Sequence, residues 1–202
     1  MSVIYTANTE RLAGYEKFLK CKYDNIYAPA SGSLSEYLWH KFGHKDSKLI
    51  IYDYYVPSLN WKKLLYDSAA EIGDINKIRD YIAETNPNLV LYNTNIDAYS
   101  AITKENLNNF SEQQWIDTIK KIDNVEFIQI DVIKDMLQVD ETEKNFIAFS
   151  NIFSYNLTLQ KIPLEEINNS LLRYYKLKNT LITGKRLDDH DQEEYRFVNI
   201  NL

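Results

Sequence analysis

The feature that most constrains the fold is an alternation along the chain between short apolar runs and amphipathic stretches. The run KLIIYDYY (48–55) suits a strand that is buried on both faces of a parallel sheet. Residues 33–42 instead place Leu34, Tyr37, Leu38 and Phe42 on one face of a helix. Strands alternating with helices predict an α/β fold with a mostly parallel sheet.

The same alternation continues along most of the chain. We expect further strands at 25–29, 125–133, 145–153 and 179–186, a last edge or antiparallel strand at 195–202, and a strand or extended segment at 88–93. We expect further helices at 8–22, from Ser58 onward, at 75–83, at 111–122 behind a capping box, and after Pro163. The pattern predicts one domain over 1–202, with a helix within 1–24 and an insertion over the site at 93–111.

Composition narrows the class of protein. Of 202 residues, 45% are hydrophobic, which is enough for one sizeable core. The formal net charge of −6 argues against a nucleic-acid partner. Cys21 is the only cysteine, so no internal disulfide can form, and no apolar run resembles a signal peptide or spans a bilayer. We therefore expect a cytoplasmic protein with no membrane partner, and the oligomeric state stays open.

The turn after the first predicted strand is the first candidate for ligand contact. In NIYAPASGSLSEYLWHKFG (25–43), the small residues Ala30, Ser31 and Gly32 would let the backbone approach a ligand closely. The N–H groups that open the next helix would point the same way. The stretch fits equally well a tight strand-to-helix connection without a ligand, because it contains only one glycine.

Two carboxylates follow predicted strands. Asp53 lies about 20 residues after Gly32, the spacing at which a carboxylate binds a ribose diol. Asp131 lies near the end of 125–133 and could accept a hydrogen bond from the amine of an adenine. Either residue could instead start the turn that follows its strand. The ligand interpretation of Asp53 gains from the small-residue turn before it.

Polar and aromatic residues gather in FSNIFSYN (149–156). Ser150, Asn151, Ser154 and Tyr155 would suit the orientation of a small polar acceptor or a sulfonium centre. A loop whose Ser and Asn side chains satisfy their own backbone explains the same residues. The two interpretations have equal weight at this stage.

Histidine and acidic residues do not favour a metal site. DDHD (188–191) lies in a polar stretch, and adjacent residues seldom converge on one ion. His40 and His44 have helical spacing, but a zinc-protease pattern also needs a glutamate and a third ligand. We expect no metal.

The order of these segments resembles that of the Rossmann-like, S-adenosylmethionine-dependent methyltransferases over about residues 10–186. NIYAPASGSLSEYL is similar to the family's first motif, KLIIYDYYVPSLNWKK to its second, NVEFIQIDVIKD to its third and NFIAFSNIFSYN to its fourth strand. The resemblance implies a Rossmann-like sandwich with helices on both faces of the sheet, S-adenosylmethionine as cofactor and methyl transfer to a small-molecule acceptor. It implies cofactor contacts from Ala30, Ser31, Gly32, Asp53, Asp131 and Ser150, and catalytic roles in orienting the acceptor for Asn151 and Tyr155.

The chain also departs from that family. The family's glycine loop usually has several glycines and an acidic residue at its start, whereas this chain has Tyr27, Ala28, Pro29 and one glycine. Only about one strand's length follows Gly184, where the family usually has an antiparallel pair. Two alternatives therefore stay open: a non-catalytic binding or assembly protein on the same fold, and a nucleotide-binding enzyme on a similar sheet.

Overall fold

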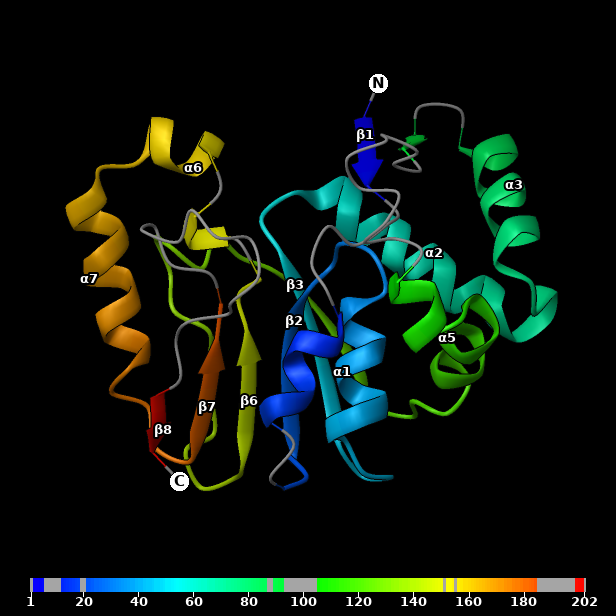
Figure 1. The fold of residues 1–202 in the computed structure, drawn as a ribbon. Coiled ribbons are helices and arrows are strands. Elements are labelled where there is room, and N and C mark those ends of the chain that lie inside the picture. The colour runs from blue at the N-terminus through cyan, green and yellow to red at the C-terminus, as the bar shows by residue number, and fades with distance from the viewer. Residues whose placement is uncertain are drawn as a thin grey trace.

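A six-stranded sheet forms the centre of the molecule (Figure 1). The structure, a computed structural model, describes residues 2–5, 12–18, 21–86, 89–92, 105–150, 152–154, 156–184 and 199–201. The strand order is β5–β3–β2–β6–β7–β8. In chain order these strands are β2 (Asn25–Pro29), β3 (Lys48–Asp53), β5 (Val125–Gln129), β6 (Asn145–Ala148), β7 (Thr180–Thr183) and β8 (Asn199–Asn201). The first five are parallel, and β8 is antiparallel to β7.

Helices cover both faces of this sheet, which confirms the predicted α/β class and gives a Rossmann-like arrangement. One face carries α1 (Leu34–Phe42), α2 (Val56–Ile72), α3 (Ile75–Thr85), α5 (Glu112–Ile119) and the 3₁₀ helix η1 (Leu12–Phe18). The other face carries α7 (Leu164–Tyr174), and Figure 1 shows α7 on the side opposite α3 and α5. The short helices η2 (Ile152–Ser154) and α6 (Asn156–Lys161) connect β6 to α7.

A second, two-stranded sheet lies apart from the main one. Its strands, β1 (Ser2–Tyr5) and β4 (Leu89–Tyr92), are parallel, with Ser2 opposite Leu89. β1 lies beside α2 at the top of Figure 1, and β4 contacts α3. The sequence predicts β4 as a strand or an extended segment, but it does not predict β1.

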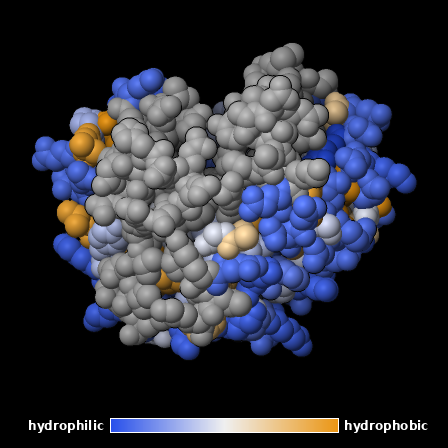
Figure 2. Space-filling view, viewed as in Figure 1, coloured by the Kyte–Doolittle hydropathy of each residue, from blue (hydrophilic) through white to orange (hydrophobic). Residues whose placement is uncertain are grey.

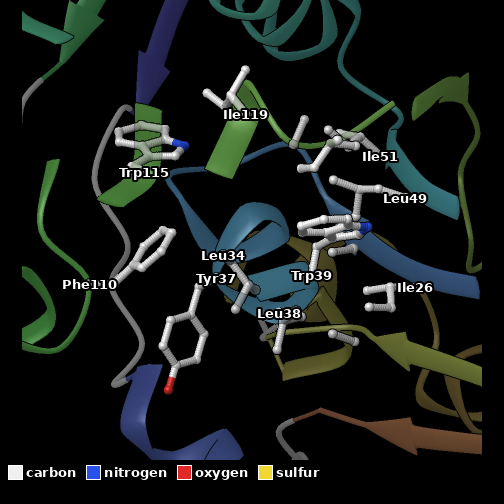
Figure 3. Close-up of a cluster of buried hydrophobic side chains, with 14 of the residues drawn as sticks. Ile26, Leu34, Tyr37, Leu38, Trp39, Leu49, Ile51, Phe110, Trp115 and Ile119 are labelled. Carbon is white, nitrogen blue, oxygen red and sulfur yellow. The ribbon is translucent and has the colours of Figure 1, made fainter. Parts of the chain in front are cut away.

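The larger part of the core lies between the sheet and α1. Figure 3 shows Ile26, Leu49 and Ile51 from the strands on one side of α1, with Phe110 and Trp115 on the other. All of these side chains are at most 4% exposed. α1 is therefore buried on more than one face, as a helix between a sheet and a second helical layer must be.

Several predicted elements are confirmed, and several boundaries are wrong. The capping box at Ser111 and Gln114 opens α5 as predicted, with Ser111 Oγ accepting from the Gln114 N–H at 3.2 Å. The helix expected at 8–22 is the 3₁₀ helix η1 where it is described, and the region 1–24 also contains β1. The helix expected from Ser58 onward begins earlier, because α2 starts at Val56 behind Tyr55. Of the predicted insertion, 93–104 lies outside the described residues, and 105–109 is helical.

The described surface is mostly hydrophilic. Figure 2 shows a largely blue area with small, scattered hydrophobic groups. The exposed large hydrophobic residues are Tyr54, Val56, Tyr81, Leu107, Leu164 and Leu172. Among the helices of the described ranges, none has both the length and the apolar character needed to cross a bilayer.

Candidate cofactor-binding edge of the sheet

The strand order identifies the edge of the sheet where a ligand would bind. From β2 the chain moves outward through β3 to β5, and it then returns to place β6 on the other side of β2. The order therefore reverses between β2 and β6. Open parallel sheets bind ligands outside the carboxyl ends of their strands at such a switch point. The turn after β2 and the residues after β6 lie at this position.

The turn after β2 has the backbone geometry expected for a close approach. Gly32 has a φ of 55°, in the left-handed region that favours glycine. The Ala30 N–H donates to the carbonyl of Tyr52 at 3.0 Å, which ties the turn to the end of β3. Neither Tyr54 nor Trp39 fills this turn, although Ala30 and Gly32 are themselves buried. The Tyr54 side chain is 69% exposed, and the Trp39 indole donates to the Ser47 carbonyl beyond the opposite end of β3.

Asp53 ends β3 beside this turn and is half-buried. Its Oδ1 accepts a hydrogen bond from the Tyr55 N–H at 2.9 Å. Burial raises the pKa of the Asp53 carboxyl to about 6, although the N–H groups of Tyr54 and Tyr55 act to lower it. Within the described part of the chain, no lysine, arginine or histidine forms an ion pair with Asp53. The fold thus holds a desolvated carboxyl at the edge without a compensating cation.

The sheet beneath this edge is closed by aromatic packing on the α7 side. Tyr52 Oη donates to the carbonyl of Ala148 at 2.7 Å, and it reaches past β2 because β3 and β6 both pair with β2. Phe149 packs edge-on against Tyr52, and its ring centroid lies 4.8 Å from that of Phe153. These three rings are buried, and together they fill the space below the edge on the α7 side.

Asp131 lies two residues beyond β5 and not at its end, so this part of the strand prediction is wrong. Its Oδ1 accepts from the Ile133 N–H at 3.2 Å, and its Oδ2 lies 3.4 Å from Lys134 Nζ. The following Val132 and Ile133 are buried against α7, where the Ser170 hydroxyl donates to the Val132 carbonyl at 3.1 Å. The carboxylate therefore organises the turn that begins at its own position.

The residues after β6 lie on the other side of the switch point. Ser150 is only 2% exposed, and its φ of 54° is unusual for a residue other than glycine. The strand itself ends at Ala148, so the predicted strand at 145–153 is too long. Asn151 and Tyr155, the predicted catalytic residues, lie outside the described residues. Of the site residues predicted at Ser150, Asn151 and Tyr155, Ser150 is the one that the structure describes.

The sequence analysis missed a buried ion pair behind the turn. Lys62 Nζ lies 2.8 and 2.7 Å from the two carboxylate oxygens of Glu36, and both side chains are 0% exposed. Lys62 also donates to Ser35 Oγ at 3.1 Å and lies 5.3 Å from the centroid of the Trp115 ring. Burial lowers the pKa of Lys62, and the Glu36 carboxylate opposes that shift. One signal was present in the sequence, because Lys62 interrupts the helical stripe formed by Leu59, Leu65 and Ala69.

Other candidate sites do not gather at this edge. In the described ranges, no group of three or more His, Cys, Asp or Glu residues could hold a metal ion. His44 lies beyond the end of α1 and pairs with Asp24 at 3.0 Å, whereas the His40 ring packs against Phe110. DDHD (188–191) lies outside the described residues. An open groove of about 560 Å³ runs beside α7, and none of the predicted site residues that are described lines it.

Comparisons with known proteins identify no relative of this chain. No protein-family model matches the chain, and no curated protein or solved structure is significantly similar to it. The functional argument therefore depends on the geometry of this edge.

Proposed function

We propose that the protein is an S-adenosylmethionine-dependent methyltransferase that acts on a small-molecule acceptor. The observation that carries the proposal is Asp53, a desolvated carboxyl at the carboxyl end of β3, next to the switch point. Carboxyl groups with strongly shifted pKa values are common at functional sites. A fold keeps such a carboxyl group desolvated, at a cost in free energy, where a ligand will bind to it. Two ribose hydroxyls could donate to the oxygens of Asp53.

The residues of the edge fit the cofactor in part. Ala30, Ser31 and Gly32 form a turn with small side chains and a left-handed glycine, where the methionine portion would lie against the backbone. Ser150 would contact the cofactor from the β6 side of the switch point. Asn151 and Tyr155 would orient the acceptor. When bound, the cofactor would supply an electrophilic methyl group on sulfur. The chain would align the acceptor with it and exclude water.

Asp131 fits the proposed adenine contact less well. One oxygen already accepts from the Ile133 N–H, and the other faces Lys134. We therefore assign adenine binding mainly to backbone and apolar groups of the edge, with Asp131 stabilising the turn from which they project.

The test is calorimetry with S-adenosylmethionine and with its demethylated product, S-adenosylhomocysteine. We expect binding of both, and at one hundred times the dissociation constant the product should stabilise the fold by about 2.7 kcal/mol. Transfer of labelled methyl groups to a small-molecule extract would then establish activity. No heat and no thermal shift with either compound at millimolar concentration would refute the proposal.

A second function is favoured by the aromatic packing below the edge. Tyr52, Phe149 and Phe153 fill the α7 side, and Asp131 is engaged in its own turn, as in a fold that has kept its architecture without its cofactor. The protein would then be a non-catalytic binding or assembly module. Product binding by the wild-type chain without methyl transfer to any acceptor would favour a ligand-sensing version of this function, and no binding would favour the assembly version.

A further inference from the structure

The buried ion pair between Glu36 and Lys62 joins the two segments that carry the candidate cofactor contacts. Glu36 lies in the first turn of α1, directly after the Gly32 turn. Lys62 lies in α2, which begins three residues after Asp53. The Asp53 carboxylate accepts from the Tyr55 N–H, so it is tied to the start of α2. A link between α1 and α2 therefore also links Gly32 to Asp53.

We propose that Glu36 and Lys62 are positioning residues that hold the Gly32 turn at a fixed separation from Asp53. The inference depends on the proposed function for its ligand but not for its geometry. Its ligand class is a nucleoside extended by an amino-acid chain, because such a molecule must contact both segments at once.

The contacts favour positioning over simple stabilisation. Lys62 makes three hydrogen bonds, to both oxygens of Glu36 and to Ser35 Oγ, and these bonds fix its position along the first turn of α1. A buried ion pair is weak support for stability, because apolar residues of similar size often stabilise a core as well or better. Apolar contacts, however, do not fix the register between two helices as three directed hydrogen bonds do.

The first test uses the volume-matched double variant Glu36→Leu/Lys62→Met and two ligands. S-adenosylhomocysteine spans both segments, whereas adenosine needs only the Asp53 side. We expect the double variant to keep its unfolding midpoint but to bind S-adenosylhomocysteine about tenfold more weakly. Its affinity for adenosine should change less than about threefold. Ile82→Val, in the buried face of α3, is the control that perturbs the core without touching the link.

The second test needs no ligand and separates this inference from the proposed function. Amide hydrogen exchange in the ligand-free double variant should be about tenfold faster at residues 31–37 than in the wild type, and unchanged in α7. Equal loss of affinity for both ligands, or unchanged exchange at 31–37, would overturn the inference. Absence of any binding by the wild type would overturn the proposed function instead, and the exchange result would still decide this inference.

Discussion

Asp53 and Asp131 follow neighbouring strands, yet the fold treats them differently. Asp53 is half-buried, no cationic side chain of the described residues pairs with it, and burial raises the pKa of its carboxyl to about 6. Asp131 caps a turn and faces Lys134. The helix after Asp53 is fixed to α1 by a buried lysine, whereas the lysine beside Asp131 is 62% exposed. Both carboxylates accept a hydrogen bond from the N–H two residues later, so they differ in the burial that raises the pKa of Asp53 and in the lysine that pairs with Asp131.

The largest expected difference between the two regions is the loss of stability when the lysine of each is replaced. Lys62→Met leaves the Glu36 carboxylate buried without its partner, and it should lower the free energy of unfolding by about 3–5 kcal/mol. Lys134→Met removes an exposed pair and should cost less than about 0.5 kcal/mol. Urea denaturation of both variants measures the contrast. Similar midpoints for the two would break the comparison.

The next difference concerns ligand affinity. Asp53→Asn should weaken binding of S-adenosylhomocysteine about 10- to 100-fold, because hydrogen bonds to a charged acceptor are each worth about 1.5–3 kcal/mol. Asp131→Asn should change the affinity by less than about threefold, since its oxygens serve the turn. Calorimetry on the two variants decides the point, and a larger loss in Asp131→Asn would reverse our assignment.

Stability against pH sharpens the contrast further. The folded pKa of Asp53, about 6, lies above the ordinary value of about 3.9, so the folded state binds more protons between these values. The contribution of Asp53 to the free energy of unfolding therefore falls as the pH rises from about 4 to about 6. Asp53→Asn removes this loss, and it should be more stable than the wild type by about 1–3 kcal/mol at pH 7.5.

The same gain should vanish near pH 3.5, where the wild-type carboxyl is protonated in both states. Thermal unfolding at the two pH values, with Asp131→Asn as the matched control, provides the measurement. A wild type that is more stable than Asp53→Asn at pH 7.5 would show that the carboxylate is locally satisfied after all.

The smallest expected effect concerns Ser150, on the β6 side of the switch point. A left-handed Ser150 is strained, so Ser150→Gly should stabilise the fold by about 0.5–1 kcal/mol. Asn179 also has a positive φ, of 48°, but asparagine enters the left-handed region more readily than serine does. Asn179→Gly should therefore give no gain. Equal shifts of the unfolding midpoint in both variants would remove the case for strain at Ser150.

The sequence predicts most of the parallel sheet well because every parallel strand except β5 is buried on both faces. β2, β3, β6 and β7 all follow from continuous apolar runs, and Gly32 and Asp53 follow from their places after such runs. The role of Asp131 could not be predicted in the same way. A residue's spacing from a strand cannot tell whether its oxygens will accept bonds from the next turn.

Long-range partners account for most of what the sequence did not predict. Lys62 interrupts an apolar stripe in the sequence, but nothing local identifies Glu36 of α1 as its partner. β1 was missed for the same reason, because its partner β4 lies far along the chain. The positive φ of Ser150 has no local signal either, since nothing in FSNIF requires it.

The pairing of β1 with β4 has a consequence for how the chain folds. These strands form parallel contacts across a loop that contains η1, β2, α1, β3, α2 and α3. Closing this loop costs entropy, and a two-stranded sheet is at best marginally stable by itself, whereas the main sheet joins six strands. We therefore expect the small sheet to form late, after the main sheet has brought α2 and α3 together. In folding, β1 and β4 would therefore pair last, over helices that are already in place.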